Sequence, residues 1–271
     1  MKKQQFILKK GSIPNALSNL HAKRPYFNHA DVVGRPMFIA WIDIMGTASL
    51  MARSMATATI IIGKLHTAIL RAIEDDASRS VAVHPLVDGA YLSSDNRDDL
   101  LSVVTDVMRG LAITFIMTDD ALHHFMVRCC VSFGPVVLGE SLRQADNAHL
   151  AGREGYTGSI LLGPAVAGAY LGERNASPFG VWIDAPARLH PEVGQQIPYT
   201  HFPWWLFDKK HSKSDLLIKN TLSSHLGIFL QWCEDHSTWI LYPKEDIKRH
   251  RAMVNEYFSN AGSHGTAHRK S

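Results

Sequence analysis

One short stretch, from Met37 to Thr47, constrains the fold of this chain more than any other. Its apolar run from Phe38 to Ile42 is rich in β-branched and aromatic side chains, which predicts a buried strand. The run ends in a single acid, Asp43, and Gly46 follows before a helical pattern begins. Because burying an unpaired carboxylate is costly, Asp43 is expected where the strand leaves the core, with a partner.

Gly46 permits the sharp turn that a strand followed directly by a helix requires. The backbone amides from Ile44 to Thr47 would then face outward with the polarity of a helix start, which suits an anion. An acid beside an anion-binding turn is typical of a metal ion bound to a phosphate. The alternative interpretation is a strand-end acid that only caps the next helix.

Composition is that of an ordinary globular protein: 271 residues, 46% hydrophobic and 20% charged, with a net charge of +3 that gives no sign of a nucleic-acid partner. Cys129 and Cys130 are adjacent in a strand-like run, so they point to opposite faces and a disulfide scaffold is not expected. The histidines show no metal-ligand spacing. No signal-peptide pattern is present, and no run approaches the roughly 20 apolar residues of a membrane span. A cytoplasmic protein with no membrane association is expected.

Along the chain, apolar residues recur with a period of about 2.0 residues where a strand is expected and about 3.6 residues where a helix is expected. Strands are expected at 36–43, 80–86, 90–94, 125–134 and 181–184, and helices at 48–73, 98–117 and 159–173. A Val87-Asp88-Gly89 turn joins the second and third strands as a hairpin, and Gly134-Pro135 is expected to end the fourth. A polar loop is expected over 140–158.

This order is typical of the ferredoxin-like, split βαβ arrangement within the α+β class. Its first strand lies at the sheet centre beside the hairpin, which would bring Asp43 and Asp88 to neighbouring strand ends. Two carboxylates placed there can hold two divalent ions about 4 Å apart. For Asp88 the alternative is a purely structural role, because Asp-Gly is a strong hairpin turn on its own.

The chain divides into four predicted segments. An N-terminal arm of a short helix and loops covers 1–34, the central domain covers 35–200, a helical extension covers 201–261, and a disordered tail covers 262–271. In the extension, the helix from Ser214 and the helix from Lys244 each carry one apolar face. Those faces are expected to form core or a dimer surface.

Three motifs together resemble the class III nucleotidyl cyclases. Residues 38–46 resemble the first metal motif of that family, residues 85–91 the second, and residues 127–134 the strand that follows. The resemblance covers about residues 36–185. It implies an α+β, ferredoxin-like cyclase palm, here followed by the C-terminal helical extension.

The resemblance also implies a site and a reaction. Asp43 and Asp88 would be the catalytic acids that bind two Mn²⁺ or Mg²⁺ ions, and the carbonyl of Ile44 would be a further metal ligand. The backbone of Ile44, Met45, Gly46 and Thr47 would hold the β- and γ-phosphates. The 3′-hydroxyl of the nucleotide would attack the α-phosphorus, and pyrophosphate would leave.

The chain departs from the purine cyclases at four positions. His84 and Ile160 stand where those enzymes usually read the purine, so hydrogen bonding to a purine edge is lost at both. Ala167 and Leu171 stand where the usual transition-state Asn and Arg would fall. Either the enzyme is inactive, or another group has taken that role.

Residues 163–174 instead resemble the divergent pyrimidine cyclases of the bacterial Pycsar antiphage system. That subgroup is implied to convert UTP or CTP to a 3′,5′-cyclic monophosphate as a homodimer, and the product activates a partner effector. Arg153, Tyr170 and Arg174 are then candidates for α-phosphate or ribose contacts. Tyr26 or Phe27 could stack on the base, or could belong to the core.

Two other functions stay open from the sequence. One is a purine cyclase with an unusual base pocket. The other is a catalytically silent cyclase-like module that binds nucleotide or a partner; the missing Asn and Arg favour it, while Asp43 and Asp88 oppose it. A diguanylate cyclase is excluded because the GGDEF or GGEEF signature is absent from the hairpin.

Overall fold

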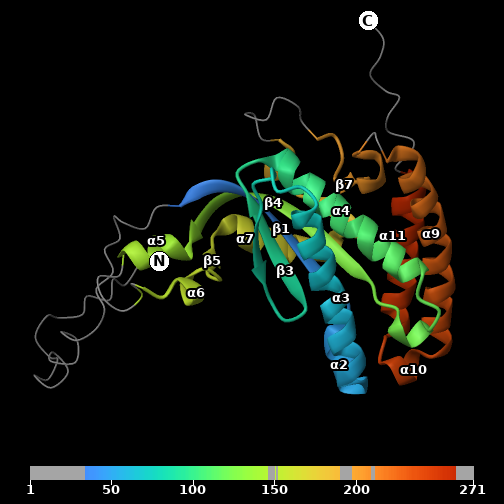
Figure 1. Cartoon of the computed structure of the whole chain (residues 1–271). Helices are drawn as coiled ribbons and strands as arrows, with labels where there is room; N and C mark the ends of the chain where they lie inside the picture. Colours follow the sequence, from blue (N-terminus) through green and yellow to red (C-terminus); the bar gives the residue numbers. More distant parts are fainter. Residues whose placement is uncertain (1–33, 146–149, 151, 190–196, 209–210, 261–271) are drawn as a thin grey trace, which may run out of the picture.

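The computed structural model describes residues 34–145, 150, 152–189, 197–208 and 211–260 (Figure 1). The predicted arm up to residue 33, including Tyr26 and Phe27, and the predicted tail at 262–271 lie outside the described residues.

A central sheet with the strand order β2-β3-β1-β4-β6-β7 organises the fold, and β5 pairs with β4 beside it. The strands are β1 (Arg35–Ile44), β2 (Ala82–Pro85), β3 (Gly89–Ser94), β4 (Val127–Leu138), β5 (Leu161–Leu162), β6 (Val181–Ile183) and β7 (His201–Phe202). Strand β1 lies antiparallel between β3 and β4, and β6 runs parallel to β4. The predicted α+β, ferredoxin-like order with the first strand at the sheet centre is confirmed.

The two faces of the sheet are covered by different helices. On one face α3 (Met55–Glu74) and α4 (Arg97–Ile116) pack against the inward side chains of β1, such as Phe38 and Ile42. On the other face α7 (Pro164–Gly172) packs through Ala165 and Ala169 on Ile39 and Trp41. This alternation along β1 means that Asp43, two residues after Trp41, points to the α7 face.

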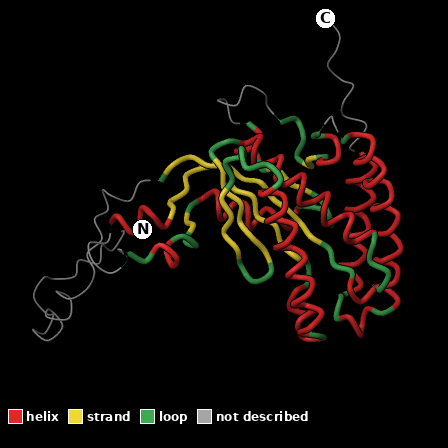
Figure 2. Tube along the Cα trace, in the orientation of Figure 1, coloured by secondary structure: helices red, strands yellow, loops and turns green. Residues whose placement is uncertain are grey.

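The C-terminal helices belong to the same core as the sheet. Helices α9 (Ser212–Asp235) and α11 (Lys244–Asn260) lie side by side at one end of the molecule, with α10 (Ser237–Ile240) between them in sequence (Figure 2). The predicted inward residues Leu222, Leu226 and Phe229 are buried, as are Ile247, Val254 and Phe258, and all of them join the core cluster of α3 and α4. The hydroxyl of Tyr257 donates to the Phe202 carbonyl at 2.5 Å and accepts from the Val181 amide at 3.3 Å.

The first predicted helix is divided in two. Helix α2 (Thr47–Arg53) ends at Ser54, whose extended backbone and side chain cap the start of α3 by accepting a hydrogen bond from the Thr57 amide at 3.2 Å. Met55, inside the stretch predicted as a single helix over 48–73, therefore falls at the first turn of a new helix and is 63% exposed.

The region from 134 to 163 also differs from its prediction. Strand β4 continues through Gly134-Pro135, which pair with Met37 and Pro36 of β1, instead of ending there. The predicted loop at 140–158 contains α5 (Gly139–Ala145), except for its first residue, and α6 (Glu154–Thr157), which lie at the opposite end of the sheet from α9 and α11 (Figure 1). The helix predicted from Ser159 begins only at Pro164, after β5. In the part of the chain that the structure describes, the remaining short helical segments are α8 (Ala185–Arg188) and three 3-10 turns, at Ala121–His123, Glu173–Asn175 and Trp204–Leu206.

Helix α3 has the length and apolar composition that a membrane-crossing helix needs, which corrects the prediction that no segment has this character. Its buried positions Ala58, Ile61, Leu65 and Ile69 pack against the sheet and α4. A single helix of this kind is weak evidence for a membrane span, because a helix in a protein core can have the same length and apolar composition.

Candidate functional site

Asp43 and Asp88 come together at one end of the central strand pair. Asp43 pairs with Gly89 across the β1–β3 ladder, and the amide of Ile44 donates to the Asp88 carbonyl at 3.0 Å. A side chain at Gly89 would put its Cβ 2.5 Å from the Ile42 carbonyl oxygen and from the Trp41 ring, so only glycine lets the hairpin approach β1 this closely. Both carboxylates are partly buried, and the charge of Asp88 raises the pKa of Asp43.

The turn after Asp43 uses half of the amides that were predicted to bind phosphate. The Ile44 amide is bonded to Asp88 and the Met45 amide donates to the Met126 carbonyl at 2.8 Å, so these two are not available to an anion. Gly46 has φ +76° and caps α2, and in the described part of the chain no hydrogen bond from the Gly46 or Thr47 amide occurs. The Ile44 carbonyl accepts from the Thr47 hydroxyl at 2.9 Å and keeps its second lone pair.

An ion pair beside the two acids was not predicted from the sequence. Arg128 stands directly opposite Asp43 in the β1–β4 register. Its guanidinium binds Glu173, with Nε at 2.7 Å and Nη2 at 3.0 Å from the two carboxylate oxygens, and both side chains are about 15% exposed or less. A charged residue within the apolar run of β4 was the only sequence signal, because such a residue needs a partner.

The electrostatic environment of Asp43 favours its protonated form. Burial raises the pKa of Asp43 from 3.8 to about 7, the charges of Glu173 and Asp88 add to this, and Arg128 opposes it. Burial likewise raises the pKa of Glu173, against the lowering effect of Arg128 and Arg174. A divalent cation bound here would relieve the repulsion among the carboxylates of Asp43, Asp88 and Glu173.

Stability of the metal-free protein is expected to depend on this group. Between about pH 4 and pH 7 the folded state keeps the Asp43 proton that the unfolded state releases, so the free energy of unfolding falls as the pH rises through that window. Asp43→Asn should remove the part of this pH dependence that comes from Asp43. In EDTA at pH 8 its free energy of unfolding should exceed that of the unmodified protein by about 2 kcal/mol after allowance for solvent screening, and its melting temperature should be higher. Thermal melts at pH 4.5 and pH 8 test this, with exposed Asp119→Asn as the matched control. An equal pH dependence in the unmodified protein and in Asp43→Asn would contradict it.

The donor atoms fit a hard divalent cation such as Mg²⁺ or Mn²⁺. Two carboxylates and the Ile44 carbonyl are oxygen ligands, which these ions prefer. Among the described residues no group of three His, Cys, Asp or Glu side chains is arranged around one ion position. The protein therefore offers a partial ligand set, of the kind that a substrate phosphate completes.

Helix α7 brings two more predicted residues toward the acids. It runs along β4, with Gly168 against Ser132 and Gly172 against Cys130, so its C-terminal end meets Arg128 through Glu173. The Tyr170 ring lies 6.1 Å from the Trp41 ring, and Arg174 is close enough to lower the pKa of Glu173. Tyr170 and Arg174 are both exposed.

Of the two predicted base-reading positions, His84 lies on the β2–β3 hairpin that carries Asp88, whereas Ile160 lies at the far end of β4, where its carbonyl accepts from the Gly139 amide at 3.0 Å. His84 faces Tyr91 in the β2–β3 register, and its Nε2 lies 3.0 Å from the Ser93 hydroxyl. Burial lowers the pKa of His84, and the nearby backbone of Gly158 opposes this. The segment that carries Ile160 therefore reaches His84.

Arg153 lies elsewhere. It precedes α6, and its carbonyl accepts from the Tyr156 amide at 3.1 Å. That helix follows the β4 end that pairs with Arg35, whereas Asp43 lies at the other end of β1. Within one chain the structure does not place Arg153 with the acids.

Comparisons with known proteins give structural likenesses only. No family model matches the chain, and no curated protein matches it. An adenylate/guanylate cyclase/hydrolase from Silicibacter pomeroyi is 18% identical with a TM-score of 0.43, and the match covers 57% of this chain and 78% of that chain. The guanylyl cyclase Cya2 is 16% identical with a TM-score of 0.46, over 58% and 78%. The guanylyl cyclase domain of the RhoGC fusion protein from the fungus Blastocladiella emersonii is 13% identical with a TM-score of 0.42, over 60% and 84%.

Proposed function

We propose that this chain is a nucleotidyl cyclase that converts a nucleoside triphosphate to its 3′,5′-cyclic monophosphate and pyrophosphate. The observation that carries the proposal is the meeting of Asp43 and Asp88 beside the Ile44 carbonyl, on a ferredoxin-like sheet whose motifs resemble those of class III cyclases. Two Mg²⁺ or Mn²⁺ ions bound there would stabilise the negative charge that develops on the α-phosphate and on the leaving pyrophosphate.

The residues of the chain have separate tasks in this proposal. Asp43, Asp88 and the Ile44 carbonyl hold the ions and so fix the triphosphate. The amides of Gly46 and Thr47 donate to its terminal phosphates, while those of Ile44 and Met45 hold the turn in place. The 3′-oxygen forms its bond to the α-phosphorus as the bond to the pyrophosphate oxygen breaks, and the 3′-hydroxyl proton leaves to solvent.

The usual transition-state Asn and Arg have no counterpart on α7, where Ala167 and Leu171 are exposed. We assign the cationic contact to Arg174 and the ribose contact to Tyr170, because the last turn of α7 and the 3-10 turn that follows it place these two residues on the side of the acids. Arg128 is committed to Glu173 and acts as a positioning residue for Asp43.

A second copy of the chain is part of the proposal. The α7 side of the molecule exposes large apolar side chains on α6, β5 and α7. These are Tyr156 at 67%, Leu162 at 50%, Tyr170 at 57% and Leu171 at 56%. A homodimer through this side would cover them and would allow Arg153 of one copy to approach the acids of the other.

The substrate is proposed to be a pyrimidine triphosphate, UTP ahead of CTP. His84 is tied to Ser93 and Ile160 is apolar, so neither offers the acid or amine that reads a purine in related enzymes. The resemblance of residues 163–174 to the Pycsar cyclases further suggests a cytoplasmic enzyme whose cyclic product activates an effector during phage infection.

Separate incubation of the purified protein with ATP, GTP, CTP and UTP in Mn²⁺ tests the assignment. We expect a cyclic pyrimidine nucleotide as the main product, detected by mass spectrometry, and at least about a tenfold preference over either purine. Cyclic AMP or cyclic GMP as the main product would favour the purine alternative. Nucleotide binding by calorimetry without turnover would favour the catalytically silent module.

A further inference from the structure

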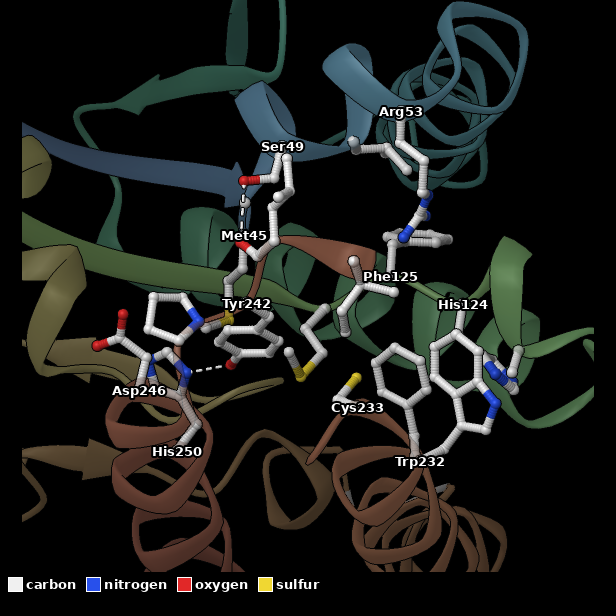
Figure 3. Close-up of a pocket in the computed structure, with 18 of the residues that line it drawn as sticks. Met45, Ser49, Arg53, His124, Phe125, Trp232, Cys233, Tyr242, Asp246 and His250 are labelled. Carbon is white, nitrogen blue, oxygen red and sulfur yellow. Dashed lines mark hydrogen bonds between the residues drawn. The ribbon is translucent and has the colours of Figure 1, made fainter. Parts of the chain in front are cut away.

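A cavity of about 290 Å³ lies between the turn that follows β1 and the C-terminal helices (Figure 3). Its walls come from residues 45–46, from α2, from the 121–126 segment before β4, and from α9 to α11. Asp43 and Asp88 do not line it, but Gly46 and Arg128 do, so the cavity adjoins the acid site without including the two acids. Its size is near the lower end of the range for small-molecule sites, roughly 300–1,000 Å³.

Most of the cavity wall is apolar and aromatic. Figure 3 shows Phe125, Trp232 and Tyr242 around the opening, with Met45 beside Tyr242. The Tyr242 hydroxyl is bonded to Nδ1 of His250, which fixes the ring and satisfies its polar end. Such walls select a flat aromatic ligand over a polar one.

Among the described arginines that line the cavity, one has no acid partner and can contact a ligand. Arg249 pairs with Asp246 at 2.9 Å and Arg128 pairs with Glu173 at 2.7 Å. Arg53 also lines the cavity, has no carboxylate partner within the described ranges, and holds its guanidinium 5.5 Å from the Trp239 ring centroid. Figure 3 shows the Arg53 side chain descending from α2 toward the aromatic residues.

We propose that this cavity binds a small aromatic anion, with its rings among Phe125, Trp232 and Tyr242 and its acidic group at Arg53. The cavity touches the acid site at two points: Met45 and Gly46 follow Ile44 directly, and Arg128 lines the cavity while facing Asp43 across the ladder. A bound ligand would hold the turn against the C-terminal helices. Resting on the proposed function, the inference therefore extends to regulation: occupancy raises the affinity of the acid site for divalent metal.

The binding site is tested with 8-anilinonaphthalene-1-sulfonate as the probe and with uncharged N-phenyl-1-naphthylamine as its neutral analogue. We expect saturable one-to-one fluorescence binding of the anion. Arg53→Gln should weaken binding of the anion about tenfold and leave the neutral analogue within about twofold, because the substitution removes a single charge-assisted contact. Arg71→Gln, an exposed arginine on α3 away from the cavity, is the matched control and should change neither.

A second variant tests the location of the rings. Ala121→Phe fills the cavity from the 121–123 turn and should weaken the binding of both probes. Ala56→Phe, on the exposed side of α3, should leave the binding of both unchanged. Circular dichroism establishes that each variant is folded; if Ala121→Phe is not, the arginine pair decides. Equal anion affinity in the unmodified protein and in Arg53→Gln would overturn the proposal.

The regulatory part has its own readout. Mn²⁺ binding followed by electron paramagnetic resonance should tighten about fivefold when the probe is saturating, and Arg53→Gln should lose this effect at the same probe concentration. Mn²⁺ affinity that is unchanged by the probe would overturn the coupling. The fluorescence titrations need neither metal nor turnover, so they decide the binding site even if the chain forms no cyclic nucleotide.

Discussion

Asp88→Asn is expected to lower cyclic-nucleotide formation by about a thousandfold or more and to leave the fold intact. The substitution keeps the size and the turn preference of the residue, and the Asp88 contact that holds the hairpin to β1 is made by its backbone carbonyl. What is lost is one of the two carboxylates that are proposed to hold the metal ions. Asp43→Asn should have an equal effect on activity, because in the proposed site both acids would hold the metal ions.

Product formation under saturating Mn²⁺ and direct Mn²⁺ binding are the two measurements. Asp95→Asn is the matched control, since Asp95 follows the other end of β3 and is exposed. Asp95→Asn should keep the rate of product formation and the Mn²⁺ affinity within about twofold of the unmodified protein. Retained turnover or unchanged Mn²⁺ affinity in Asp88→Asn would contradict the two-carboxylate site.

Asp215→Ala is expected to destabilise the protein by about 3–5 kcal/mol. Asp215 is fully buried in α9, and Arg109 of α4 donates to its two oxygens from Nε at 2.7 Å and from Nη2 at 2.8 Å. Removing the acid leaves the partly buried guanidinium with Asp106 as its one acid partner among the described residues, and the hydrogen bond of Asp106 with Arg109 Nη1 cannot replace the bidentate pair. Thermal unfolding should shift down by about 10 °C for a chain of this size.

Asp235→Ala, at the exposed end of the same helix, is the control and should change the free energy of unfolding by less than about 0.5 kcal/mol. Replacing both partners, as in Arg109→Met with Asp215→Leu, should recover most of the loss because no buried charge is then left unpaired. Neutral surface substitutions shift the thermal unfolding midpoint by roughly ±2 °C. A shift of Asp215→Ala within about that range would show that the ion pair contributes nothing to stability.

The sequence predicted best the elements whose hydrophobic period is strong. Strand β1 and helix α4 lie within one residue of their predicted bounds, and the apolar residues Leu100, Val104 and Leu111 of α4 are fully buried. The order of strands and helices was predicted from where the hydrophobic period changes between 2.0 and 3.6 residues. That order in turn predicted that Asp43 lies beside the hairpin that carries Asp88. The role in phage defence, the pyrimidine preference and the homodimer stay predictions.

The rest depended on contacts between residues far apart in the chain. The Arg128–Glu173 pair exists because α7 crosses the sheet face and ends over β4, which no local pattern indicates. The amides of Ile44 and Met45 were predicted to face outward, but neighbouring strand ends supply acceptors for both. The break at Ser54 had a local signal, a serine followed by the helix it caps, which the long apolar stripe on both sides concealed.

The Tyr257 hydroxyl, near the end of the last helix, bridges the main chains of β6 and β7, the two outermost strands on that side of the sheet. A chimera that grafts residues 35–200 into another protein would leave behind both β7 and the tyrosine that anchors it. The sheet would then present an unpaired border to solvent, the kind of surface through which strands of different molecules join. For anyone recombining this scaffold, the natural unit of exchange therefore runs to residue 260.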